Sequence, residues 1–107
     1  MFGRKKQGVD VRTANRMASD DGYVILDVRT APERLEARPP QSVHITLDTL
    51  AIHIDKLKDR KVLVICRSGD RSATAARFLN DRGIEALNID GGIIAWARAG
   101  LPVKTGA

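Results

Sequence analysis

The chain has 107 residues, of which 43% are hydrophobic and 29% are charged, a composition typical of one globular domain. Its net charge of +5 favours anionic ligands, but the basic residues are scattered and only 4% of residues are aromatic, so we expect no nucleic-acid partner. The single cysteine excludes an internal disulfide, and no apolar run suits a membrane span or a signal peptide, so we expect a cytoplasmic protein without a membrane partner.

The N-terminal part of the chain predicts a strand, a helix and a second strand. Residues 1–8 have no periodic pattern and are expected to form a flexible lead-in. Residues 9–11 predict a short edge strand, and Thr13 is a candidate N-cap for a helix that ends near residue 19. Residues 23–26 are a short apolar run between turn signals, which predicts a buried central strand.

The next segment begins with polar residues and a capping signal. Asp27 and Arg29 place an acid and a base at the carboxyl end of the predicted strand. Thr30 and Glu33 have the spacing of a capping box and predict a helix that runs to about residue 37. Residues 38–42 include two prolines and therefore predict a loop.

Residues 43–45 then predict a short strand, and Thr46 or Asp48 is expected to cap a helix. Five apolar residues after Thr46 recur at helical spacing, which favours one continuous helix. They are Leu47, Leu50, Ala51, Ile54 and Leu57.

The second half of the chain repeats the alternation of strand and helix. Residues 62–65 predict a buried strand, residues 66–72 a polar loop, and residues 73–81 a helix that Gly83 ends. Residues 84–89 predict one more strand. Gly91 and Gly92 then turn the chain into a final helix, in which Trp96 is expected to anchor the core.

This alternation predicts an α/β fold with a parallel sheet and helices on both of its faces. We expect one domain over residues 9–103 and a C-terminal tail over residues 104–107. Ligands of such sheets bind beyond the carboxyl ends of the strands. Residues 27–29 and 66–72 both fall there, and they therefore form the candidate site, with Asp27 and Arg29 expected to support the loop.

Cys66 lies where a strand becomes a loop before a helix, a position that stabilises an anion. A helix N-terminus and nearby arginines lower the pKa of a cysteine from about 8.5 to roughly 3.5–7.5, which makes it a nucleophile. In the loop, glycine lets the backbone N–H groups turn inward, the serine hydroxyls can donate to a sulfur anion, and the arginines attract an oxyanion. The loop residues are Arg67, Ser68, Gly69, Asp70, Arg71 and Ser72.

Three motifs in order make the chain resemble a single-domain rhodanese. They are the loop of residues 66–72, the strand end Asp27-Val28-Arg29 with Glu33, and the closing pattern Gly91-Gly92, Trp96 and Gly100-Leu101-Pro102-Val103.

The resemblance implies a three-layer fold with a five-stranded parallel sheet and no metal or organic cofactor. It also implies a sulfurtransferase in which Cys66 takes sulfane sulfur from thiosulfate or a related donor, becomes a persulfide, and passes the sulfur to a thiol or to cyanide. The thiol acceptor can be a small molecule or a protein.

Two other interpretations of the same residues stay open. Cdc25-type phosphatases and arsenate reductases resemble this fold, but their loop is one residue longer than the four residues between Cys66 and Arg71. The shorter loop suits one sulfur atom better than a phosphate, and Asp70 would repel a dianion. A non-catalytic binding or regulatory module is the second alternative, against which the presence of Cys66 argues. Residues 37–42 lack the two glycines and the histidine that the family commonly has there.

Overall fold

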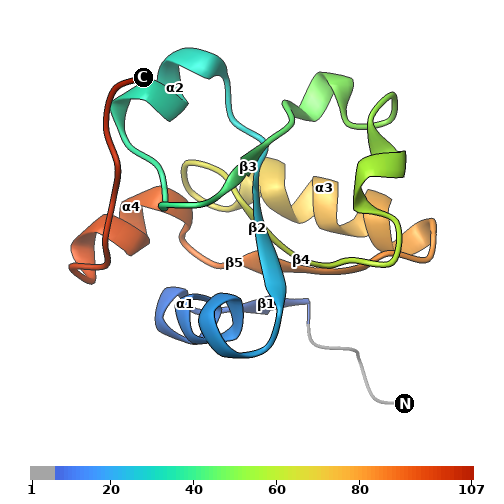
Figure 1. The fold of residues 1–107 in the computed structure, drawn as a ribbon, viewed down its shortest axis with the longest axis horizontal. Coiled ribbons are helices and arrows are strands. Elements are labelled where there is room, and N and C mark those ends of the chain that lie inside the picture. Colours follow the sequence, from blue (N-terminus) through green and yellow to red (C-terminus); the bar gives the residue numbers. More distant parts are fainter. Residues whose placement is uncertain (1–6) are drawn as a thin grey trace.

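The apolar runs of the sequence become the strands of one sheet. The computed structural model describes residues 7–107. Its five strands all pair in parallel, in the order β1-β5-β4-β2-β3, which confirms the predicted fold class (Figure 1). The strands are β1 (Gly8–Val9), β2 (Tyr23–Asp27), β3 (Val43–His44), β4 (Lys61–Ile65) and β5 (Glu85–Ile89).

Helices cover both faces of this sheet. One core lies between the sheet and the helices α1 and α4, and the other lies between the sheet, α3 and two short 3₁₀ turns. None of the helices in residues 7–107 is both long and apolar enough to cross a membrane. The helices are α1 (Val11–Asp20), α2 (Ala31–Glu36), α3 (Asp70–Asp81) and α4 (Gly92–Arg98), and the 3₁₀ turns are η1 (Leu47–Thr49) and η2 (Ile54–Leu57).

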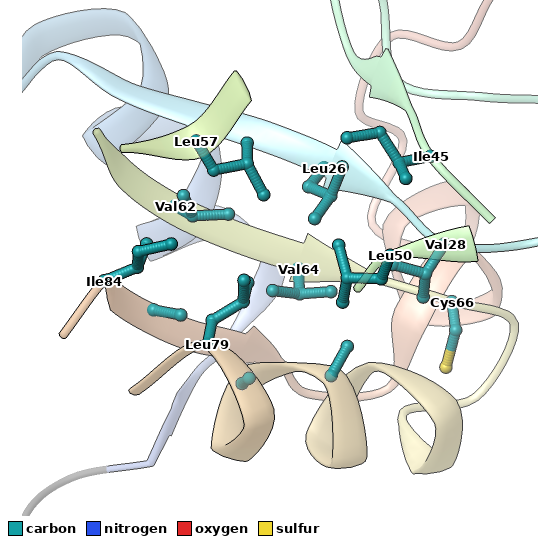
Figure 2. Packing of buried hydrophobic residues seen from close by; sticks show 13 residues of the cluster. Leu26, Val28, Ile45, Leu50, Leu57, Val62, Val64, Cys66, Leu79 and Ile84 are labelled. Atoms are coloured by element: carbon teal, nitrogen blue, oxygen red, sulfur yellow. The ribbon is translucent and has the colours of Figure 1, made fainter. Parts of the chain in front are cut away.

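The central strand β4 is buried on both faces because its side chains alternate between the two cores. Val62 and Val64 contribute to the core beside α3, and Leu63 and Ile65 to the core beside α1 and α4. Cys66 continues the first row, and Figure 2 shows its sulfur at the end of that row, beyond Val64. The alternation of β4 therefore directs the cysteine side chain toward α3.

The N-terminal elements differ in detail from the prediction. Asp10, not Thr13, caps α1, since its carboxylate accepts a hydrogen bond from the Thr13 N–H at 2.8 Å. The predicted strand 9–11 is therefore shorter, because Val11 already belongs to the helix. Gly8, which the sequence pattern places in the lead-in, pairs with Asn88 in the sheet. Residues 1–6 of that lead-in lie outside the described residues.

The prediction of one helix over residues 47–57 is wrong. The segment forms η1 and η2 instead. Leu50, which follows η1, and Leu57 of η2 reach the core, while Ala51 between the two turns is exposed. Leu47 and Leu50 are three residues apart, as are Ile54 and Leu57, a spacing that fits a 3₁₀ turn as well as an α-helix. Thr46 precedes η1 without a side-chain capping bond and Asp48 lies inside η1, so neither predicted cap begins a helix.

The C-terminal segment packs against the proline-containing loop. Arg38 and Lys104 form an antiparallel bridge with two backbone hydrogen bonds of 2.9 and 2.8 Å. The Arg38 guanidinium also donates to the Gly106 carbonyl at 2.7 Å. The Trp96 indole N–H donates to the Pro102 carbonyl at 2.8 Å, and its side chain is buried as expected of a core anchor.

A buried ion pair organises the end of β2. The Asp27 carboxylate is fully buried and accepts from the Arg29 backbone N–H at 3.0 Å and from Nε and Nη2 of the same residue, each at 2.9 Å. Arg34 adds a further bond to Asp27 at 3.2 Å. The Arg29 guanidinium also donates to the carbonyls of Glu33 and Ala37, and this ties α2 to β2. The side-chain hydrogen bonds of Asp27 therefore go to Arg29 and Arg34, and Asp27 supports the cysteine loop only indirectly.

Replacing Asp27 should destabilise the domain strongly. Asp27→Asn leaves the buried Arg29 guanidinium without its counter-charge, and we expect the free energy of unfolding to fall by about 3–5 kcal/mol. Urea unfolding followed by circular dichroism measures this loss. Asp81→Asn, at an exposed carboxylate, should change the stability by less than about 0.5 kcal/mol. Equal losses in both variants would contradict a special role of the buried pair.

The N-terminus of α4 supports the cysteine loop from behind. The N–H groups of Ile93 and Ile94 donate to the carbonyls of Cys66 and Arg67 at 2.9 and 3.2 Å. Gly92 directly precedes them with φ +59°, and a Cβ there would meet both carbonyl oxygens closer than 3.0 Å. Only glycine fits this contact, which explains one of the two glycines of the closing motif.

Gly92→Ala should displace the cysteine loop. The left-handed φ alone costs about 1–2 kcal/mol for alanine, and the clash with the loop backbone adds to that cost. Gly83→Ala is the matched control, because Gly83 has φ +82° and no atom lies within 4 Å of the place that its new methyl group would take. Thermal unfolding should show a larger loss for Gly92→Ala than for Gly83→Ala. Equal losses would show that the contact with the loop carbonyls is unimportant.

Candidate functional site

The sulfur of Cys66 lies in a cradle of hydrogen-bond donors. Cys66 follows directly after β4 and is 1% exposed. The Gly69 N–H donates to Sγ at 3.0 Å, and the Ser72 hydroxyl lies 3.2 Å from Sγ. Gly69 has φ +116°, a left-handed conformation that turns its N–H back toward the sulfur. Gly69 therefore directs one backbone N–H to the sulfur.

This cradle lowers the pKa of the Cys66 thiol. Burial raises the pKa, but hydrogen bonds from the Ser72 hydroxyl and from the backbone N–H groups of Ser72, Gly69 and Ser68 together outweigh it. The pKa of Cys66 therefore lies below that of an ordinary cysteine. These donors stabilise the charged form of the sulfur, so the thiolate forms more readily than in a free cysteine.

α3 begins at Asp70, three residues earlier than the prediction, because Gly69 serves as its N-cap. Arg71 and Ser72 therefore lie in the first turn of the helix and not in the loop. This placement lets the Ser72 side chain reach back to the sulfur. It also brings the partial positive charge of the helix N-terminus to the same place.

Arg71 forms a two-pronged ion pair with Glu33 of α2. Its two terminal nitrogens lie 2.8 and 2.7 Å from the two carboxylate oxygens. The hydrogen bond from Arg71 is the main reason that the pKa of Glu33 falls from 4.5 to about 2. Cys66 contributes to the raised pKa of Arg71, after the larger effect of Glu33, so the guanidinium also senses the charge of the sulfur. Arg71 is thus held in place beside the cradle.

Three more of the predicted residues lie at the surface, two in the loop and Asp70 at the start of α3. Arg67, Ser68 and Asp70 are exposed. Arg67 contributes its carbonyl to the α4 contact, and Ser68 acts on the sulfur through its backbone N–H. Asp27 and Arg29 reach the site indirectly, since the Arg29 guanidinium donates to the Glu33 carbonyl at 3.2 Å. The predicted residues therefore have three kinds of position. Gly69 and Ser72 form the cradle around the sulfur, Arg67, Ser68 and Asp70 form an exposed rim, and Asp27 and Arg29 support the site from β2.

Sequence reasoning missed Asn88 and gave no role to His44. The Asn88 side-chain oxygen of β5 accepts a hydrogen bond from the Ser72 hydroxyl. The ring of His44 is hydrogen-bonded to the Arg29 carbonyl at 2.7 Å. A polar residue near the carboxyl end of a strand was the available signal for Asn88, because such ends border ligand sites in parallel sheets. No comparable pattern distinguishes His44.

The site combines a sulfur nucleophile with a small group of donors that stabilise an anion. Within residues 7–107, no group of three or more His, Cys, Asp or Glu side chains is placed to hold a metal ion. The cradle offers N–H and O–H donors to one sulfur atom, with a guanidinium fixed beside it. Such donors stabilise negative charge on the sulfur, both when it acts as a nucleophile and when it departs as a leaving group.

Proteins named as sulfurtransferases are similar to this chain over most of its length. A sulfurtransferase of Allochromatium vinosum is 37% identical over 92 residues, which cover 84% of this chain and 86% of the relative. The thiosulfate sulfurtransferase GlpE of Vibrio cholerae serotype O1 is 31% identical over 98 residues, which cover 90% of this chain and 92% of the relative.

Solved structures share the fold of this chain. A rhodanese-related protein from Thermoplasma volcanium superposes with a TM-score of 0.82 at 31% identity, covering 92% of this chain and 97% of that protein. A Rhodopseudomonas palustris protein described as a possible tyrosine phosphatase superposes with a TM-score of 0.83 at 28% identity, covering 92% of this chain and 85% of that one. Residues 9–99 match the family model of the rhodanese-like domain. Since that match runs from β1 into the residue that follows α4, the chain belongs to the rhodanese-like domain family.

Proposed function

We propose that this protein is a sulfurtransferase that moves sulfane sulfur from thiosulfate or a related donor to a thiol or to cyanide through a persulfide on Cys66. The observation that carries the proposal is the convergence of the Gly69 N–H and the Ser72 hydroxyl on Sγ. The relatives named as sulfurtransferases support the reaction class.

In the first step, the Cys66 thiolate attacks the outer sulfur of thiosulfate. A bond forms between Sγ and that sulfur, the sulfur–sulfur bond of thiosulfate breaks, and sulfite leaves with the electron pair. Arg67 at the exposed rim and Arg71 beside the cradle can attract the dianion and stabilise the departing sulfite. No oxidant or reductant besides the donor is required.

In the second step, an acceptor thiolate or cyanide attacks the outer sulfur of the persulfide. The new bond forms at that sulfur, and Sγ leaves as a thiolate into the same cradle of donors. Because the chain has one cysteine, no second thiol of the same chain can resolve the persulfide as a disulfide. The sulfur therefore passes to another molecule. A reducing compartment such as the cytoplasm keeps this thiol free, and we place the reaction there.

The two alternatives predict different outcomes when the protein is offered a substrate. A phosphatase would release phosphate from an aryl phosphate, and a binding module would turn over neither substrate. The spacing of four residues between Cys66 and Arg71 favours sulfur over phosphate, since a short loop suits one sulfur atom better than a tetrahedral phosphate. The lowered pKa of the buried thiol favours catalysis over a binding role.

Cys66→Ser tests the proposal directly. Intact-mass measurement after thiosulfate treatment should show one added sulfur atom on the wild type and none on Cys66→Ser, with sulfite released only by the wild type. A polysulfide donor tests the related substrates in the same way. If the wild type gains no sulfur from either donor, the binding module is the better interpretation, and release of phosphate from an aryl phosphate would support the phosphatase.

Glu33→Gln tests whether the ion pair fixes the first turn of α3. The pKa of Glu33 is lower in the folded protein than its ordinary value of 4.5, so the pair stabilises the fold above that pH and this contribution is lost as the pH falls toward about 2. At neutral pH we expect Glu33→Gln to lower the free energy of unfolding by about 1–2 kcal/mol, since the pair is partly exposed.

Urea unfolding at several pH values measures this difference, which should shrink as the pH falls below 4.5. Glu36→Gln is the matched control, because Glu36 is an exposed carboxylate on the same helix. A difference between wild type and Glu33→Gln that is independent of pH would show that the ion pair is not its cause.

A further inference from the structure

The Ser72 hydroxyl has more acceptors within reach than it has protons. Its oxygen lies 3.2 Å from the sulfur of Cys66, 3.2 Å from the Gly69 carbonyl and within hydrogen-bond distance of the Asn88 side-chain oxygen. A hydroxyl carries one proton and donates one such bond at a time. Ser72 is fully buried, so bulk water does not compete for that proton. The acceptor that Ser72 selects decides whether the sulfur receives this hydrogen bond.

The orientation of the Asn88 amide is set by its other neighbour. Its NH₂ group donates to the Asp90 carboxylate at 3.0 Å, and an ionised carboxylate only accepts hydrogen bonds. The carbonyl oxygen of the amide must therefore face Ser72. Strand β1 fixes this end of β5, since the backbone N–H groups of Asn88 and Asp90 donate to the carbonyls of Gln7 and Val9 at 2.9 and 2.8 Å. The second acceptor is thus rigidly placed.

We propose that Asn88 is a positioning residue for Ser72, whose hydroxyl turns to Asn88 when Cys66 carries a proton or a sulfur atom and turns to Sγ when Cys66 is a thiolate. The thiol and thiolate states need no assumption about the reaction. The persulfide state rests on the proposed sulfur transfer.

The two hydrogen-bond patterns follow from what each sulfur can accept. In the thiol, S–H donates to the Ser72 oxygen while the hydroxyl donates to Asn88. In the thiolate, Sγ has no proton and is the stronger acceptor, so the hydroxyl turns to it. In the persulfide, the charge lies on the outer sulfur and the inner Sγ accepts weakly, so the hydroxyl returns to Asn88. The change is a rotation about the Cβ–Oγ bond and transfers no proton between residues.

Asn88 therefore stabilises the thiol and the persulfide relative to the thiolate. Charged side chains also lie on the surrounding elements, and the Asn88→Ala substitution changes none of these residues, although it removes the amide that donates to Asp90. They are Asp27 of β2, Glu33 of α2, Arg67 of the loop, Asp70 and Arg71 of α3, and Asp90 beyond β5.

The pH dependence of alkylation by iodoacetamide tests the proposal, and the single cysteine makes the rate report Cys66 alone. Asn88→Ala removes the competing acceptor and should lower the pKa of Cys66 by about half to one pH unit, the effect of one neutral hydrogen bond. Asn88→Asp retains an acceptor and adds a negative charge, and should raise that pKa. Ser72→Ala removes the donor to the thiolate and should also raise it.

Asn80→Ala is the control for a disturbed β5. The Asn80 side chain bonds both the N–H and the carbonyl of Ala86 in this strand, at 2.9 and 3.0 Å, away from Ser72. It should leave the pKa of Cys66 unchanged. An unchanged or higher pKa in Asn88→Ala, or a lower one in Asn88→Asp, would overturn the proposal. Because the titration uses no sulfur donor, such a failure leaves the proposed function standing, and a protein that titrates as expected but never accepts sulfur refutes only that function.

Discussion

The arrangement of the cysteine loop and of the elements around it serves one requirement, which is to stabilise negative charge on a sulfur atom that is almost completely buried. Burial alone disfavours a thiolate, and the cradle of N–H and O–H donors around Cys66 more than offsets that cost. Each donor occupies its position for a separate reason. Gly69 adopts a left-handed conformation that only a residue without Cβ adopts readily, and this conformation begins α3 early enough to bring Ser72 to the sulfur.

The elements around the loop hold it from several sides. The N-terminus of α4 donates to the carbonyls of Cys66 and Arg67, and Gly92 permits that approach. On the other side, Asp27 and Arg29 fasten α2, and α2 presents Glu33 to Arg71. A loop held from these sides keeps its backbone N–H donors in place when charge moves onto or away from the sulfur, and preorganised donors of this kind are usually the largest electrostatic contribution to catalysis in enzymes.

The membership in the rhodanese-like domain family and the geometry support the same chemistry from independent directions. The family match covers residues 9–99, and the relatives named as sulfurtransferases cover most of the chain. The donors of the cradle converge on the single sulfur atom of Cys66. The proline-containing loop, which departs from the family pattern, is bound by Arg34 and by the C-terminal segment through Arg38. This loop therefore has both an unusual composition and several contacts that hold it in place.

The sequence by itself determined the α/β class, the five strands and the position of Cys66, because apolar runs, capping signals and a lone cysteine after a strand are local patterns. It did not determine whether residues 47–57 form a helix, since a spacing of three residues fits two kinds of turn. Only the tertiary structure decided that Arg71 pairs with Glu33 and that Asn88 meets Ser72. These partners lie 38 and 16 residues apart, and strand order and crossover geometry, which no local pattern encodes, bring them together.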